Sequence, residues 1–285
     1  MARLDKNSML CPNCRKLISS DEPSCPYCGI TNPGSRWKKG VSRLSLRDPS
    51  DIITILLYTN AALFILSILL NPSSVGLSAN PLMFFAPSNK SLLILGATGT
   101  FPIDHFHRWW TLVSATYLHG GILHIFFNMI ALRQLGPFVL SEYGLNRFFI
   151  IYTLTGIAGF FISYLAGVPF TIGASASVCG LIGATLYYGK SRGGFYGEAL
   201  FKQVMGWVIG LALFGFFVPG INNWAHGGGI AAGIALGFLL GYHEKTRENL
   251  LHRILFAACV LLTVVVLGWA ILQALYLRFL YNPGM

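Results

Sequence analysis

Charged residues are scarce in this 285-residue sequence, since Asp, Glu, Lys and Arg together make up only 11%. A soluble globular domain carries roughly a quarter. Hydrophobic residues account for 54% of the chain, and the mean hydropathy is +0.61. The few charges lie in short stretches, separated by apolar runs of about 17 to 28 residues, the length that crosses a ~30 Å hydrocarbon core. This pattern excludes a soluble domain and predicts an all-α polytopic membrane protein.

Acidic residues are missing where hydrolytic chemistry inside a membrane would need them. Between residues 105 and 243 the only carboxylates are Glu142 and Glu198, both near one expected membrane face. An aspartyl mechanism needs two facing carboxylates, and the zinc-protease motif HExxH does not occur. A Ser-His-Asp triad would lack its acid for the same reason. Any hydrolytic site in this part of the chain therefore falls to serine and histidine alone.

The N-terminal segment also lacks a hydrophobic run before residue 50, so we expect no cleaved signal peptide and an uncleaved first anchor. Residues 1–40 form a separate unit. It holds two CxxC pairs: Cys11 with Cys14, and Cys25 with Cys28. Four thiolates at this spacing suit tetrahedral Zn²⁺ and resemble zinc-ribbon modules. Two disulfides are the alternative, which a reducing cytosolic location disfavours.

Such a small module has little core of its own, so we expect the bound zinc to supply most of its folding energy. A basic tether with Arg36, Lys38 and Lys39 follows it and is expected to rest on anionic headgroups. We expect a role in sensing, or in recruiting a cytosolic partner.

Seven apolar segments are predicted as membrane helices in the domain of residues 50–285. They lie near 52–70, 116–140, 148–168, 172–189, 203–218, 221–242 and 254–281. With the N-terminus inside, 17 of the 20 basic residues fall on the cytoplasmic side, which also explains the net charge of +10 without nucleic acid. The C-terminus is then expected outside, in a cell inner or plasma membrane. The stretch 71–110 is too polar to span and should lie in the interface.

Polar side chains occur within three of these segments. Ser175 lies fifteen residues before Lys190, which places it about 22 Å above the cytoplasmic face at ~1.5 Å per residue. His226 lies sixteen residues before Tyr242, or about 24 Å above the same face. The serine and the histidine are therefore expected at one depth, beneath the outer surface.

Stripes of small residues share the helix faces of both: Cys179 and Gly183 follow Ser175, and Gly229 and Gly233 follow His226. Such stripes let helices approach closely, so we expect these two segments to pack face to face.

A third segment carries His124 and Asn128, four residues apart and thus on one helix face. Both can donate toward an oxyanion, alongside the backbone N–H of Ser175. His119 is expected to be a structural donor at the outer end of this segment. Taken alone, a membrane serine usually bonds to its own backbone. Only the coincidence of several polar groups at one depth favours a Ser-His dyad.

Four motifs occur in order: Trp109-Trp110, the run from His119 through His124 to Asn128, Gly173-Ala174-Ser175, and the run from Ala225-His226 to Gly233. Together they resemble the rhomboid family of intramembrane serine proteases over residues 50–285. The resemblance implies a six-helix core, here with a seventh C-terminal helix. It also implies that substrates are transmembrane helices, cut near their outer end.

The resemblance further implies that Ser175 is the nucleophile and His226 its base. It implies that His124 and Asn128 help to form the oxyanion hole, which His119 supports. No cofactor is expected for this chemistry.

Three positions depart from the family pattern: Ala176 replaces a glycine, Cys179 an aromatic residue, and Thr111 an arginine. They leave open an inactive rhomboid-like protein that binds transmembrane helices without cutting them. A remote alternative is haem held between His124 and His226, which a Soret band would reveal.

Overall fold

The computed structural model describes residues 8–11, 16–19, 22–29, 31, 33, 50–77 and 84–281. The chain divides into two compact units, Met1–Ile52 and Ile53–Met285.

The first unit is built on a small antiparallel hairpin. Strand β1 (Ser8–Leu10) pairs with β2 (Leu17–Ser19). The hairpin is closed by a hydrogen bond from the Cys11 amide to the Lys16 carbonyl (2.9 Å). Its small core consists of Cys11, Ile18 and Cys25. The cysteine side chains therefore supply much of the buried material of this unit.

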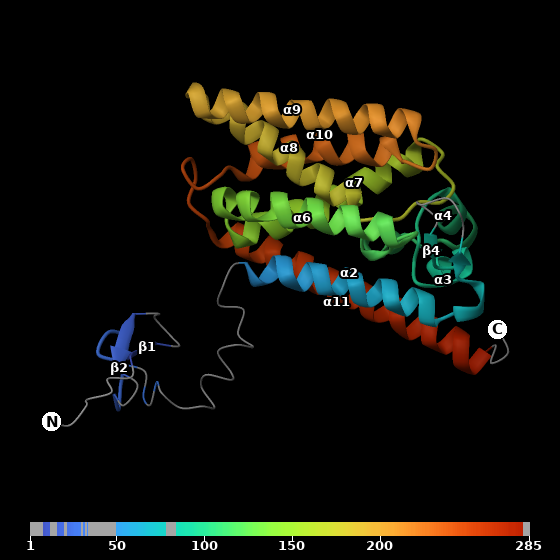
Figure 1. Ribbon diagram of the computed structural model, residues 1–285, viewed down its shortest axis with the longest axis horizontal. Coiled ribbons are helices and arrows are strands. Elements are labelled where there is room, and N and C mark those ends of the chain that lie inside the picture. Colours follow the sequence, from blue (N-terminus) through green and yellow to red (C-terminus); the bar gives the residue numbers. More distant parts are fainter. Residues whose placement is uncertain are drawn as a thin grey trace. The chain divides into compact units, whose positions relative to one another are not determined.

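The second unit is helical, apart from one short hairpin. Its long helices are α2 (Asp51–Leu69), α6 (Ile122–Tyr143), α7 (Leu145–Leu165), α8 (Ser175–Arg192), α9 (Gly194–Phe217), α10 (Asn223–Leu240) and α11 (Leu250–Leu275). Figure 1 shows them running along one another. Between α2 and α6 lie η1 (Pro72–Ser74), β3 (Gly76–Leu77), β4 (Phe84–Ala86), α3 (Asn89–Ile94), α4 (Thr100–Phe106), α5 (Thr111–Ser114) and η3 (Ala115–Tyr117); η4 (Tyr276–Tyr281) follows α11.

Each predicted apolar segment overlaps one long helix, although the starts of two are wrong. The fifth segment was expected to begin at 203, whereas α9 begins at Gly194. The second segment was expected to begin at 116, whereas α6 begins at Ile122. Residues 115–117 instead form the tight turn η3, and Gly121 precedes α6 with an extended backbone. In the predicted interfacial stretch 71–110, the described residues form short elements, the longest being the seven residues of α4; the place of this stretch in the interface stays a prediction.

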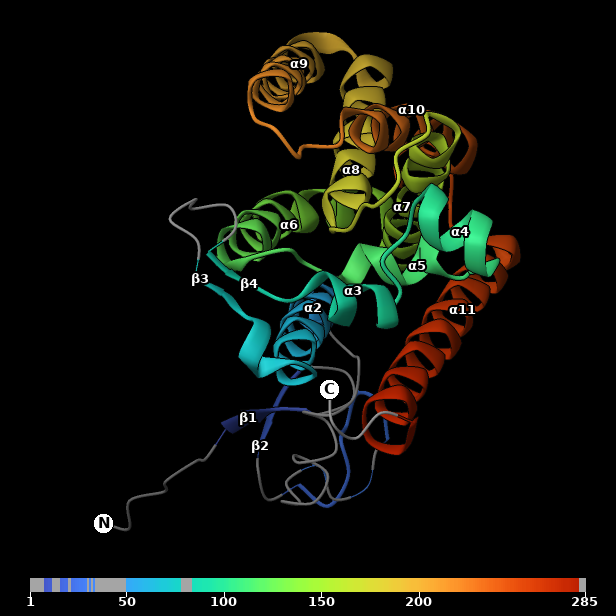
Figure 2. The ribbon, with the colours of Figure 1, turned by 90° about the vertical axis from the view of Figure 1, so that its right-hand side faces the viewer.

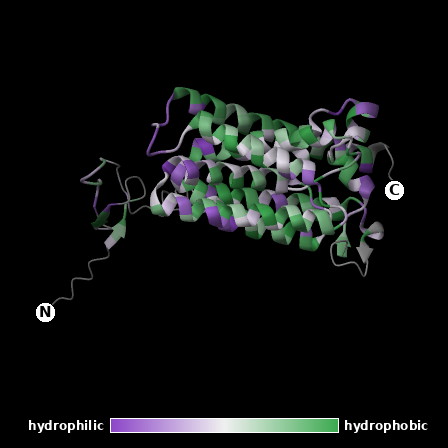
Figure 3. Cartoon of the chain, turned by 90° about the horizontal axis from the view of Figure 1, so that it is seen from above, coloured by the Kyte–Doolittle hydropathy of each residue, from purple (hydrophilic) through white to green (hydrophobic). Residues whose placement is uncertain are grey.

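Within the described part of the chain, five helices are long and apolar enough to cross a membrane: α2, α6, α7, α9 and the span from α11 to Arg278. The outer surface of these helices carries many exposed aromatic and aliphatic side chains, such as Trp207 and Phe217 on α9. Figure 3 shows hydrophilic residues gathered mainly toward the helix ends and in the loops. This surface suits lipid, because a soluble protein rarely exposes so large an apolar area. The chain is thus an integral, multi-pass membrane protein; seven spans stay a prediction.

Helices α8 and α10 are shorter, at 18 residues each, and are rich in glycine and alanine. Helix α8 packs against α6, α7, α9 and α10 and lies between them in Figure 2. A Cβ on Gly229 would meet the Ala176 carbonyl, and one on Gly233 would meet the Gly180 carbonyl. On the facing helix, a Cβ on Gly183 would meet the Ile230 carbonyl. The two backbones therefore touch without side chains between them.

Replacing Gly233 with alanine should destabilise the bundle by about 1–3 kcal/mol, because the added methyl forces the α8 and α10 backbones apart. Thermal unfolding in detergent measures this change. Gly268 on α11 is the matched control, since a Cβ there meets nothing within 4 Å. Gly268→Ala should leave the unfolding temperature unchanged or raise it. Equal unfolding temperatures for the two variants would contradict the close packing.

Candidate active site at the start of helices α8 and α10

Ser175 is the first residue of α8, so its side chain lies at the amino end of an 18-residue helix. The preceding turn depends on Gly173, whose φ of +125° disfavours any other residue. The Gly173 amide donates to the Ala115 carbonyl of η3 (2.9 Å), which fixes the approach to the helix. Amide N–H groups in the first turn of a helix lack intrahelical acceptors and carry partial positive charge. An anion that forms beside Ser175 would be stabilised there.

His226 lies in the first turn of α10 and is 93% buried, because only 7% of its surface is exposed. The contacts of Gly229 with Ala176 and of Gly233 with Gly180 make α8 and α10 parallel. A Cβ on Gly159 of α7 would meet both the Ala225 carbonyl and the Ala176 methyl, so the residue before His226 and the residue after Ser175 lie beside the same point of α7. The serine and the histidine thus stand at the same end of two touching helices.

Asn222 holds the start of α10 and was not identified from the sequence. Its Oδ1 accepts from the Ala225 amide (3.1 Å), which caps the helix. Its Nδ2 donates to Ser163 Oγ on α7 (2.6 Å) and to Thr171 Oγ1 in the loop before α8 (2.9 Å). This one side chain joins three elements around the site. An asparagine directly before an apolar helical run is a capping signal, so the cap was predictable, whereas the two donations were not.

His124, on α6, faces the same turn from the other side. Its Nδ1 accepts a hydrogen bond from the Gly120 amide (3.2 Å). A neutral imidazole therefore carries its hydrogen on Nε2. A Cβ built on Gly173 would lie 2.7 Å from that Nε2 and 3.7 Å from Ser175 Oγ. The Nε2–H donor and the serine hydroxyl thus border one small volume, which only a glycine at position 173 leaves open.

Asn128 and His119 are connected to the candidate site through His124. Asn128 is buried, and its Nδ2 donates to the His124 carbonyl one turn earlier (2.8 Å). That bond gives the amide a structural task besides any role in catalysis. His119 is fully buried and meets the His124 ring edge-on, with ring centroids 5.1 Å apart. Neither His119 nitrogen has a hydrogen-bond partner among the described residues. It supports His124 by packing, and the expected hydrogen-bond donation is not seen.

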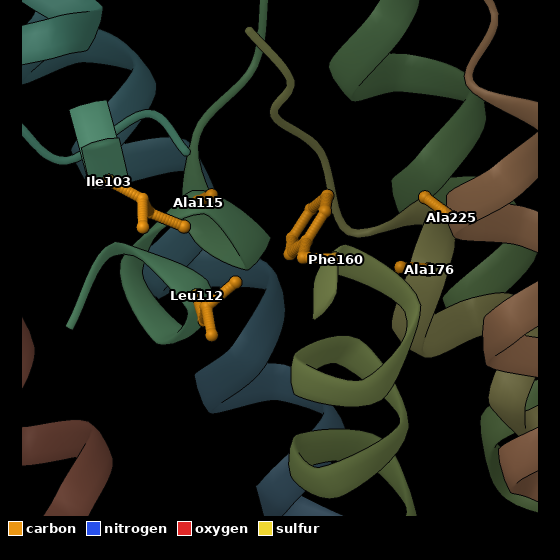
Figure 4. Close-up of a cluster of buried hydrophobic side chains, with 6 residues drawn as sticks. All are labelled: Ile103, Leu112, Ala115, Phe160, Ala176 and Ala225. Atoms are coloured by element: carbon orange, nitrogen blue, oxygen red, sulfur yellow. The ribbon is translucent and has the colours of Figure 1, made fainter. Parts of the chain in front are cut away.

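The Ala176 methyl, which departs from the family pattern, points into an apolar cluster that Figure 4 displays. The cluster is formed by Ile103, Leu112, Ala115, Phe160, Ala176 and Ala225. This cluster therefore brings Ala176, which follows Ser175, and Ala225, which precedes His226, into contact with Ala115 of η3 and its neighbours. The Ala176 methyl thus fills the core between α7, α8 and α10. Cys179 is likewise buried and faces Gly229.

Three cysteines of the first unit gather at one point. The sulfur atoms of Cys11, Cys25 and Cys28 lie within 4.8 Å of one another, and those of Cys11 and Cys28 are 3.7 Å apart. Two thiolates on one tetrahedral zinc are about 3.8 Å apart, given Zn–S bonds of ~2.3 Å. A disulfide bond would be far shorter, at about 2.05 Å. The cluster could thus hold a metal ion; Cys14 lies outside the described residues.

Comparison with known proteins agrees with this arrangement. The rhomboid domain family model matches residues 107–243, the part of the chain that carries the whole candidate site. RHOMBOID-like protein 2 of Arabidopsis thaliana is 31% identical over 215 residues, which cover 69% of this chain and 67% of that protein. The chain belongs to the rhomboid family.

Two further relatives of this rhomboid protein match shorter regions. RHOMBOID-like protein 5 of Arabidopsis thaliana is 35% identical over 170 residues, or 55% of this chain and 52% of the relative. Rhomboid protease GluP of Bacillus subtilis (strain 168) is 32% identical over 167 residues, or 56% of this chain and 33% of GluP. The chain thus matches about half of the first of these relatives and a third of the second.

Asn222→Ala should destabilise the rhomboid domain by about 1–2 kcal/mol, because the cap and both Nδ2 donations are lost. Asn222→Asp keeps an accepting oxygen for the Ala225 amide but cannot donate to Ser163 and Thr171. We expect it to show an intermediate loss. Thermal unfolding of the three proteins measures the order, and equal stability of wild type and Asn222→Ala would contradict the role of this side chain.

Proposed function

We propose that this rhomboid protein is an intramembrane serine protease that uses a Ser175–His226 dyad. The observation that supports the proposal is that the Ser175 hydroxyl and the His124 Nε2–H donor border one small volume beside Gly173, while His226 lies in the first turn of α10, the helix that touches α8. A nucleophile, a base and an oxyanion donor are the parts that acyl transfer needs.

The reaction follows from these positions. Ser175 Oγ attacks the scissile carbonyl, while His226 takes the hydroxyl proton and later gives it to the leaving amine. The oxyanion receives the His124 Nε2–H and lies at the positive end of α8. Asn128 is proposed as a further donor. Only one of its two amide hydrogens is used in the bond to the His124 carbonyl, so the other can reach the oxyanion. Water then releases the acyl group from Ser175.

We infer that the substrates are transmembrane helices of membrane-anchored proteins, cut near their outer end. The candidate site lies at the start of α8 and α10, and the distribution of basic residues supports the proposal that these starts face the non-cytoplasmic side. GluP, a relative of this chain, is named as a rhomboid protease. The N-terminus is proposed to be cytoplasmic and the C-terminus to lie outside, with seven helices crossing the membrane.

Purified protein in vesicles should cleave a model transmembrane substrate, and Ser175→Ala should reduce the rate by at least about 10³-fold, because nucleophilic catalysis is lost. Ser177→Ala is the matched control. Ser177 is a buried serine on the same helix, and it faces Thr116 and Gly156 rather than the candidate site. Its variant should keep near-wild-type activity. Equal cleavage by wild type and Ser175→Ala would refute the dyad.

The first unit is proposed to be a zinc ribbon. The described cysteines present their sulfurs at the spacing of thiolates on one zinc ion, and Cys14 is proposed as the fourth ligand. A bound zinc would stabilise the hairpin β1–β2 and contribute nothing to peptide hydrolysis. A cytosolic partner of this ribbon remains part of the proposal.

Metal analysis of the full chain should find one zinc per protein, and Cys25→Ser should lose it, because three ligands hold structural zinc far less tightly than four. Cys259→Ser on α11 is the control and should keep the metal. Zinc content that is the same in both variants would exclude the ribbon site. Peptide cleavage should be unaffected in either case, provided that the protein remains folded.

A further inference from the structure

The loop that joins α7 to α8 is paired with the start of α4. Thr98 and Thr171 exchange two backbone hydrogen bonds: the Thr98 amide donates to the Thr171 carbonyl (3.1 Å), and the Thr171 amide donates to the Thr98 carbonyl (2.7 Å). The first amides of a helix lack acceptors within that helix. Two such amides of α4 donate to the same loop, that of Thr100 to the Val168 carbonyl (2.9 Å) and that of Phe101 to the Pro169 carbonyl (3.2 Å). We call the paired stretches, residues 98–101 and 168–171, the loop bridge.

Gly99 shows how closely the two stretches of the loop bridge approach each other. Its φ is +135°, and a Cβ built on it would collide with the Pro169 carbonyl. A residue with a side chain is disfavoured there both by this contact and by the backbone conformation. The loop bridge ends at Thr171, two residues before Gly173 and four before Ser175. Any group that fixes residues 98–101 therefore also fixes the approach of the chain to the serine.

Thr111, the first residue of α5, contacts the loop bridge through its side chain. Thr111 and Thr98 are both fully buried. The Thr111 hydroxyl donates to Thr98 Oγ1 (3.0 Å) and to the Arg108 carbonyl (2.6 Å), which share its one hydrogen. We call Thr98 and Thr111 the hydroxyl pair. It forms at one of the positions that depart from the family pattern, where Thr111 replaces an arginine.

The other stretch of the loop bridge is connected to α10. Thr171 Oγ1 accepts a hydrogen bond from Nδ2 of Asn222, the cap of the helix that carries His226 (2.9 Å). Leu112, which follows Thr111, shares the apolar cluster of Figure 4 with residues of α8 and α10. Helix α5 thus reaches the starts of both helices in two ways, by apolar contact and by hydrogen bonds through the loop bridge.

We propose that Thr111 is a positioning residue, whose hydroxyl fixes the loop bridge and through it the turn before Ser175 and the start of α10. This inference rests on the proposed protease function. The hydroxyl pair forms its contact without a buried charge, so it avoids the desolvation that a buried arginine would cost. The replacement of arginine at this position is then compatible with an active enzyme.

The competing interpretation is that the hydroxyl pair only satisfies two buried polar atoms, while the backbone hydrogen bonds hold the loop bridge by themselves. Thr111→Val keeps the shape of the side chain and removes the hydroxyl, which leaves Thr98 Oγ1 without its donor. Under the competing interpretation this variant loses stability but keeps kcat and the protection of the loop bridge. Thr111→Ser retains the hydroxyl and should restore the behaviour of the wild type.

The test measures kcat and KM for a transmembrane substrate with the full chain in vesicles, together with amide hydrogen exchange of residues 98–101 and 168–171. Thr111→Val should lower kcat about tenfold, which corresponds to ~1.4 kcal/mol in the barrier. KM should stay within about twofold, because the buried Thr111 does not touch the substrate. Exchange in both stretches of the loop bridge should become faster.

Thr185→Val is the matched control for a buried threonine. The Thr185 hydroxyl donates to the Leu181 carbonyl of its own helix (2.8 Å), ten residues or about 15 Å along α8 from Ser175. This variant should leave kcat and the exchange of the loop bridge unchanged. Equal effects of Thr111→Val and Thr185→Val would show a general loss of stability and would contradict the positioning role.

Thr98→Val removes the other partner of the hydroxyl pair and should give similar losses. In the double variant with Thr111→Val the losses should not add, because both substitutions break the same hydrogen bond. Additive losses would overturn the role of the pair. Thr98→Val also carries the test if Thr111→Val fails to fold.

Either wild-type kcat or wild-type exchange of the loop bridge in Thr111→Val would overturn the proposal. Exchange also decides the matter independently of catalysis. If the wild type cleaves no substrate, the protease function fails, yet faster exchange in Thr111→Val that Thr111→Ser restores would still support the positioning of the loop bridge. Unchanged exchange in that case would exclude it.

Discussion

The direct contact between the backbones of α8 and α10 is the constraint on which the candidate site depends. Glycines at 183, 229 and 233 leave no side chain between the two helices, so carbonyl groups of each touch the other. Two helices in such contact have one register, and that register sets Ser175 and His226 at the same end. A dyad without a third acidic member needs this rigidity, because no carboxylate orients the imidazole.

Two layers of packing surround this contact. The apolar cluster of Figure 4 binds Ala176 and Ala225, the immediate neighbours of Ser175 and His226, to Phe160 and to the turn η3. Asn222 adds hydrogen bonds among α7, α10 and the loop before α8. Preorganised groups stabilise a transition state without reorganisation during the reaction. Both layers thus hold the neighbours of Ser175 and His226 in place, as the proposed dyad would need.

Much of this arrangement could be predicted from the sequence. Apolar length predicted the membrane helices, and stripes of small residues predicted that the segments of Ser175 and His226 pack together. Which residues share a helix face follows from the helical periodicity, because these residues are only three or four positions apart in the sequence. The first unit could be recognised as a separate module for a similar reason. Its paired cysteines lie close together in the sequence, and such pairs are typical of zinc sites.

Other features depend on contacts between distant segments and could not be predicted. Helix α6 starts at Ile122 and not at residue 116, as predicted, because residues 115–117 form η3. The Ala115 carbonyl of η3 accepts a hydrogen bond from the Gly173 amide, which no local sequence pattern reveals. The direction of the Ala176 methyl depends on where Phe160 of α7 lies. Such tertiary contacts override the local preferences of the sequence for helix or turn. The motifs that carry the family resemblance do not reveal them either.

The proposed dyad is tested most directly by mapping the adduct of a fluorophosphonate probe on the reconstituted protein by mass spectrometry. Phosphonylation requires a serine whose proton a neighbouring base can accept. We expect one adduct, on the peptide that contains Ser175, and its loss when His226 is replaced by alanine. An adduct on another residue, or undiminished labelling of Ser175 without His226, would contradict it.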